Sequence, residues 1–108
     1  MVRKSLKNFY QKKKNIPRIY TGKLSDVSIS RLEDGYPILV KDVYLATGEP
    51  IDDHLWMRLE VFPQTLGLNI GDIIKFTGIV ELYRKQNGTI DYGISPVQES
   101  FTKANEAT

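Results

Sequence analysis

The chain of 108 residues contains no cysteine and only one histidine. Without cysteine the protein forms no disulfide, has no thiolate nucleophile and cannot build a cysteine-ligated zinc site. It also has no apolar run near the roughly 20 residues of a membrane-spanning helix, and no apolar stretch beside Met1 resembles a signal peptide. We therefore expect a cytoplasmic protein with no membrane partner.

The residue patterns of a catalytic centre are also missing. No serine stands in a nucleophile-elbow motif, and no glycine-rich phosphate loop precedes a segment with helical periodicity. Asp52, Asp53 and His54 are consecutive and include ligand types for a hard cation, but adjacent residues of a strand point to opposite faces. We expect a protein that is not an enzyme and that uses neither a metal nor a cofactor.

Acidic residues are absent from the first 18 positions, which carry seven Lys and Arg residues. The other 90 residues carry 8 basic and 13 acidic side chains, so a +7 segment precedes a remainder of net charge −5. Because like charges repel, residues 1–17 are expected to form a flexible arm or a frayed helix. Such an arm gains affinity for phosphates by releasing counterions; the alternative is a solvated tail that only aids solubility.

Alternating apolar and polar residues predict the strands, because successive side chains of a strand point to opposite faces. The longest alternation covers residues 72–83, where Gly78 marks a bend or a close backbone approach in mid-strand. Asn87-Gly88 suits a tight hairpin turn, and the returning strand is expected at 90–94.

Three earlier segments also have the composition of strands, at 19–30, 36–47 and 54–62. In the second of them, the apolar parity slips by one residue at Lys41-Asp42, which is typical of a β-bulge. A turn-rich loop is expected at 48–53, and a short helix at 64–68.

The chain resembles an OB-fold in the order of these segments, with a short helical piece between the third and fourth strands. The segments that carry the resemblance are IYTGKLSDV (19–27), YPILVKDVYL (36–45), DHLWMRLEV (53–61) and IGDIIKFTGIV (70–80). The resemblance implies an all-β, five-stranded, partly open barrel with a basic N-terminal arm. The arm is then expected at 1–17, the barrel at 18–101 and a disordered tail at 102–108. An SH3-like small barrel is the alternative.

The resemblance also implies a ligand on the second and third strands. Trp56 is the main candidate there, because it falls among polar residues on the side of its strand opposite the apolar residues. Aromatic rings stack on bases, and neighbouring cations contact phosphates. The expected site consists of Trp56, Arg58, Lys41, Tyr44 and Tyr36. The alternative is that the arm or the loop 48–53 covers Trp56.

Two further groups of residues are expected to contribute to the same site. The tip of the last hairpin supplies Tyr83, Arg84 and Lys85, with Tyr92 on the returning strand. A hairpin tip is also a common place for solvated charges. The arm supplies the cations Lys12, Lys13, Lys14 and Arg18.

These residues predict a protein that binds single-stranded nucleic acid with little sequence preference, with single-stranded DNA first and RNA as an alternative. By fold-level analogy it would serve DNA replication, recombination or transfer. A second hypothesis is a protein-interaction module, in which a barrel edge or the arm engages a partner.

Overall fold

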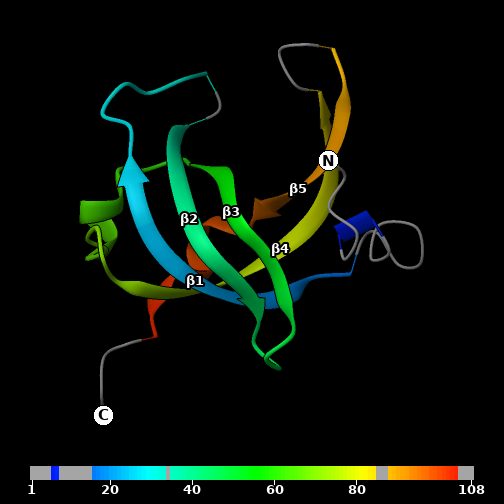
Figure 1. Ribbon diagram of the computed structural model, residues 1–108. Coiled ribbons are helices and arrows are strands. Elements are labelled where there is room, and N and C mark those ends of the chain that lie inside the picture. The colour runs from blue at the N-terminus through cyan, green and yellow to red at the C-terminus, as the bar shows by residue number, and fades with distance from the viewer. Residues whose placement is uncertain (1–5, 8–15, 34, 85–87, 105–108) are drawn as a thin grey trace.

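The computed structural model of the protein describes residues 6–7, 16–33, 35–84 and 88–104 (Figure 1). The strands are β1 (Arg18–Val27), β2 (Tyr36–Leu45), β3 (Pro50–Leu59), β4 (Ile73–Arg84), β5 (Ile90–Pro96) and the short β6 (Thr102–Lys103). Two 3-10 helices accompany them, η1 (Pro63–Leu66) and η2 (Gln98–Ser100). The predicted all-β fold is confirmed, and η1 is the short helical piece expected between the third and fourth strands.

The strands form one antiparallel sheet in the order β3-β2-β1-β4-β5, with β6 added beside β4. β1 pairs with β2 along one edge and with β4 along the other. The sheet is strongly curled (Figure 1). The end strands β3 and β5 come to lie next to each other across a seam. The result is a nearly closed, five-stranded, OB-like small barrel. Among the described residues, no helix is long and apolar enough to cross a membrane.

The parity slip predicted at Lys41-Asp42 is a β-bulge. Asp42 has a positive φ of 52°, and the side chains of Val40 and Val43 are both buried while Lys41 and Asp42 are exposed. The register between β1 and β2 shifts at the same place, because Thr21 pairs with Tyr44 but Lys23 pairs with Lys41. The extra residue lets β2 bend while the apolar residues on both sides of the bulge stay inside.

Residues 50–53, predicted to be a loop, are instead the first part of β3. Pro50 pairs with Tyr44 and Asp52 with Val43, so the connection between β2 and β3 contains only residues 46–49. Proline and aspartate are poor strand formers, but pairing with β2 outweighs this local preference. β3 also ends at Leu59 rather than at the predicted Phe62.

The expected C-terminal tail begins later than residue 102. Thr102 and Lys103 pair with β4, and the Ala104 N–H donates to the Ile73 carbonyl at 2.7 Å. The preceding Phe101 is buried and stacks on Phe76 with 5.1 Å between ring centroids. This anchor holds the segment against the sheet. Residues 105–108 lie outside the described residues.

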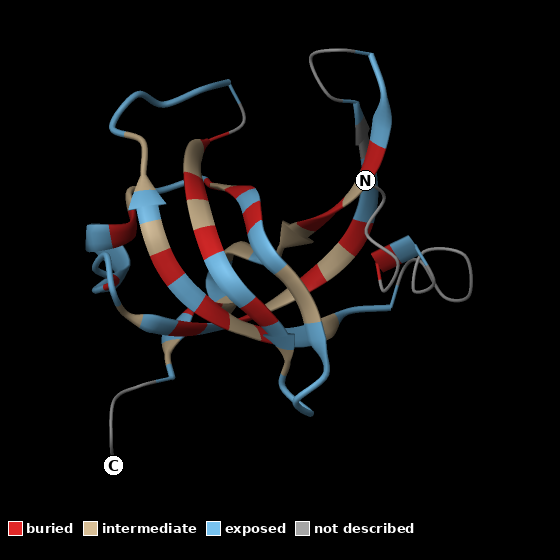
Figure 2. Ribbon diagram, in the orientation of Figure 1, coloured by how far each residue is buried: buried red, intermediate tan, exposed pale blue. Residues whose placement is uncertain are grey.

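The interior of the barrel is filled by alternate side chains of the strands, seen as buried bands along the ribbons in Figure 2. Leu6 of the N-terminal arm is also fully buried and belongs to this core. Residues 1–17 were expected to form a flexible arm or a frayed helix, and within this segment the Leu6 side chain packs into the barrel core. Most of the remaining arm lies outside the described residues.

The predicted close approach at Gly78 is present. A Cβ atom built on Gly78 would collide with the Ile94 side chain of β5, and Gly78 pairs with Arg18 on one side and with Pro96 on the other. A side chain at this position would push β5 away from β4. The hairpin connection itself covers residues 85–89, of which 85–87 lie outside the described residues, and Gly88 has the expected positive φ of 88°.

Tyr20 places a polar group in the middle of the core. Its ring stacks on Phe76 with 5.8 Å between centroids, and its hydroxyl is buried without a hydrogen-bond partner in the described part of the chain. Burial raises the pKa of Tyr20 to about 12, while the nearby Arg18 acts in the opposite direction. The folded protein therefore holds Tyr20 neutral at pH values where an unfolded chain, with a tyrosine pKa near 10, ionises it.

Replacing Tyr20 with phenylalanine is expected to raise the free energy of unfolding by about 1 kcal/mol, because the stack stays and the unpaired hydroxyl is removed. The contribution of Tyr20 to stability should be constant up to about pH 10 and then fall as the pH rises towards 12. The free energy of unfolding of the Tyr20→Phe variant should fall less over that pH range. Urea unfolding at pH 8 and pH 11 measures both effects. An equal alkaline loss in the two proteins would contradict the assignment to Tyr20.

Candidate functional site

Trp56 lies near the middle of β3 on the outer face of the barrel, with 50% of its surface exposed. Its neighbours Leu55 and Met57 are buried, which confirms the predicted alternation along this strand. The residue opposite Trp56 on β2 is Leu39. The loop 48–53 was one predicted cover for Trp56, but its residues 50–53 belong to β3, which pairs with β2. Half of the largest aromatic side chain is therefore open to a ligand.

Three basic side chains form a row on the outer face beside Trp56. Lys41 of β2 pairs with Lys23 of β1 and with His54 of β3, and all three residues are exposed. Directly opposed residues of an antiparallel pair have Cβ atoms about 5 Å apart on the same face, where like charges repel. An anion bound along this basic row (Lys23, Lys41, His54) would relieve the repulsion between the two lysines.

A groove of about 430 Å³ lies on the other side of Trp56, between β3 and the β4–β5 hairpin. Apart from Trp56, its wall includes Arg58 of β3, Glu60 just after β3, and Glu81, Leu82 and Pro96 from the hairpin. The groove thus contains two carboxylates and one guanidinium, together with apolar surface. Its charge differs from that of the basic row, although Trp56 borders both.

Gln98 of η2 closes the seam between β3 and β5 beside this groove. Its side-chain oxygen accepts a hydrogen bond from the Glu60 N–H at 2.8 Å. Its side-chain nitrogen donates to the Arg58 carbonyl at 3.2 Å and to the Pro96 carbonyl at 3.4 Å. One side-chain amide therefore replaces backbone pairing between the two strands and fixes the separation of the groove's walls.

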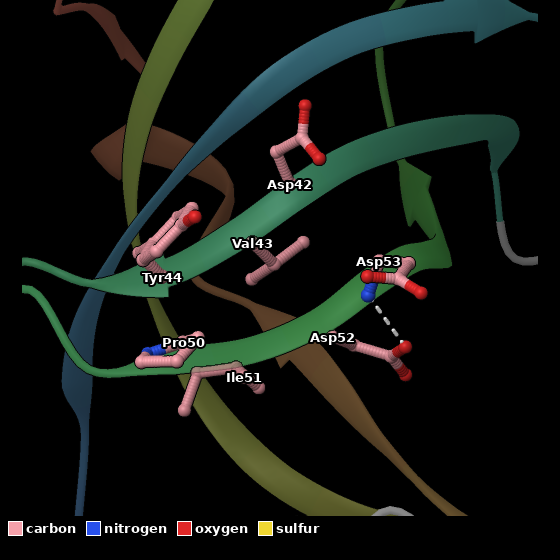
Figure 3. Close-up of a pocket in the computed structure, with 7 residues that line it drawn as sticks. All are labelled: Asp42, Val43, Tyr44, Pro50, Ile51, Asp52 and Asp53. Carbon is pink, nitrogen blue, oxygen red and sulfur yellow. Dashed lines mark hydrogen bonds between the residues drawn. The ribbon is translucent and has the colours of Figure 1, made fainter.

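Tyr44 lies on β2 opposite the first residue of β3, away from Trp56. It pairs with Pro50 and lines a shallow pocket of about 170 Å³ with Asp42, Asp52 and Asp53 (Figure 3). The Asp42 side chain points away from the other two carboxylates (Figure 3), and Asp52 accepts a hydrogen bond from the Asp53 N–H at 2.7 Å. Within the described ranges, no three His, Cys, Asp or Glu residues are grouped to hold a metal.

Tyr36 and Tyr92 are both half-buried by other parts of the protein. The Tyr36 ring packs edge-on against Phe62 with 5.3 Å between centroids, and the Arg31 guanidinium lies 6.0 Å from the ring centre. Tyr92 packs against the core and pairs with Leu82 across the hairpin. Neither ring joins Trp56 as a freely exposed stacking surface.

The two remaining described cations of the predicted site lie at strand ends. Arg84 is exposed at the end of β4, where its Nη1 donates to the Gly88 carbonyl at 3.3 Å. Arg18 begins β1 and donates from Nη1 to the Ile16 carbonyl at 3.3 Å. Outside the described residues are the Tyr83 side chain, Lys85, Lys12, Lys13 and Lys14.

The structure thus brings together Trp56, Arg58 and Lys41 from the predicted site and adds Lys23 and His54. Sequence reasoning missed Lys23, although its alternation with Gly22 and Leu24 already put it on the outer side of the strand. Comparison of the chain with protein-family models, curated proteins and solved structures finds no match. The case for a function therefore comes from the outer face itself.

Proposed function

We propose that the protein binds single-stranded nucleic acid, with single-stranded DNA as the first candidate and RNA as the alternative. The observation that carries the proposal is the half-exposed Trp56 between the basic row and the groove. Stacking of a base on an aromatic ring contributes about 1–3 kcal/mol, and the row offers cations to the adjoining phosphates. This combination suits an unpaired strand, because the bases of a duplex have no free face for stacking.

Little sequence specificity is part of the proposal, since every base has a face that can stack. We also propose that the protein belongs to the OB-fold superfamily, supported by the strand order and by the position of η1 between β3 and β4. A non-enzymatic, cytoplasmic role in DNA replication, recombination or transfer fits this proposal by analogy with the fold.

The basic row provides the test of the electrostatic half of the proposal. Replacing Lys23 or Lys41 with alanine should weaken binding of single-stranded DNA and lower the slope of log K against log salt by about 0.7 for each lost phosphate contact. Lys103→Ala is the control for the loss of one lysine, because Lys103 is not a member of the row and forms an ion pair with Asp72 at 3.5 Å. Equal slopes for all three variants and the wild type would contradict phosphate contacts at the row.

A second candidate function is binding of a protein partner at the seam. β3 and β5 end the strand order of the sheet, and an extended peptide can add to a strand edge of this kind. Trp56 would then be an anchor at the interface. Salt separates the two functions, because an apolar interface responds little to ionic strength whereas binding to phosphates falls steeply.

A further inference from the structure

The groove and the basic row divide the outer face by charge, with Trp56 between them. Glu60 and Glu81 line the groove from its two walls, and neither side chain forms a hydrogen bond or ion pair within the described part of the chain. Among the described residues of the groove wall, Arg58 is the one cation, and it already has an interaction partner. The negative phosphates of a bound strand would therefore follow the row of Lys23, Lys41 and His54.

When a base stacks on Trp56 and its phosphate lies at the basic row, the edge of the base that is farthest from the phosphate points into the groove. That edge would meet the carboxylates of Glu60 and Glu81 beside the apolar surface of Leu82. Ionised carboxylates only accept hydrogen bonds. Cytosine, adenine and guanine carry exocyclic amino groups that donate to carboxylates. Thymine and uracil have no amino group, and their one ring donor, the N3–H, is flanked by two carbonyl oxygens that carboxylates repel.

We propose that this groove selects bases with an exocyclic amino group over thymine and uracil. The inference rests on the proposed binding of single-stranded nucleic acid and adds which strands are preferred. It remains compatible with little sequence specificity, because the selection concerns one chemical group shared by three of the bases.

The test compares two oligonucleotides of about 15 nucleotides, oligo(dC) and oligo(dU), which differ in the group at position 4 of the ring and in the N3 proton. Both carry a 5′ fluorescent label, and anisotropy gives their dissociation constants at the same salt concentration. The wild type should bind oligo(dC) about fivefold or more tightly than oligo(dU). Oligo(dU) binding as tightly as oligo(dC) would overturn the inference and leave the proposed function standing.

The carboxylates are tested by the double variant Glu60→Gln with Glu81→Gln, because glutamine can both donate and accept. Its preference for oligo(dC) should fall below about twofold, mainly through tighter binding of oligo(dU). Glu33→Gln with Glu49→Gln is the control for the change of charge, since both residues lie in connections between strands and outside the groove. A preference retained in the double variant would overturn the role of the carboxylates. Absence of binding to either oligonucleotide would overturn the proposed function together with this inference.

Discussion

Replacing Gly35 with alanine is expected to lower the free energy of unfolding by about 3 kcal/mol, combining backbone strain with a steric clash. Gly35 has a φ of 133°, and a Cβ atom there would lie 2.5 Å from the Leu59 carbonyl oxygen. The turn cannot easily move away, because Gly35 and Leu32 exchange two backbone hydrogen bonds at 2.9 and 3.1 Å. A shift of this turn would also reach the candidate site. Gly35 directly precedes β2, and its neighbour Tyr36 pairs with Leu59 of β3, the strand that carries Trp56.

Urea unfolding of Gly35→Ala and Gly48→Ala measures this prediction. Gly48 also has a positive φ, of 105°, but no atom lies within 4 Å of a Cβ built on it. Gly48→Ala should therefore lose about 1 kcal/mol from strain alone. The difference between the two losses of unfolding free energy measures the cost of the collision with Leu59 of β3. Equal losses would contradict the close contact between this turn and Leu59.

Replacing Trp56 with alanine is expected to weaken the binding of single-stranded DNA by about 1–3 kcal/mol, which is roughly five- to 150-fold in the dissociation constant. The free energy of unfolding should change little, because half of the side chain is already exposed on the outer face. Anisotropy of a labelled oligonucleotide gives the affinity, and urea unfolding gives the stability. A variant that unfolds would show instead that Trp56 serves the packing of the barrel.

Tyr44→Ala is the matched control for the loss of an exposed aromatic ring. Tyr44 is 43% exposed, close to the 50% of Trp56, but it lies in the pocket with Asp42, Asp52 and Asp53. Because Tyr44 lines neither the groove nor the basic row, binding should stay within about twofold of the wild type. A loss as large as that of Trp56→Ala would show that aromatic exposure matters but the groove does not.

Much of the fold could be predicted from the sequence, because the strands of a barrel carry a period of two. The apolar residues on both sides of Lys41-Asp42 even located the bulge, since one extra residue in a strand changes the parity of the apolar positions that follow it. The start of β3 could not be found in this way. Pro50 and Asp52 have weak local preferences for a strand, and only their pairing with β2 places them in one.

The candidate site could be predicted only in part. Trp56 followed from alternation along its own strand, but the basic row depends on which residues face each other on different strands. The bulge at Asp42 sets that register, so that Lys41 meets both Lys23 and His54. Gln98 likewise reaches Arg58 and Glu60 from a distant part of the chain. Contacts of this range arise only once the barrel has closed.

The central claim is that a base stacks on Trp56, and the single tryptophan of the chain reports on it directly. The measurement is a titration of the intrinsic fluorescence with unlabelled single-stranded DNA and RNA oligonucleotides at low and moderate salt. We predict saturable quenching that weakens as salt is added, and the oligonucleotide that binds more tightly identifies the preferred polymer. Unchanged fluorescence, together with no binding in an anisotropy assay, would contradict the account and direct attention to a protein partner at the seam.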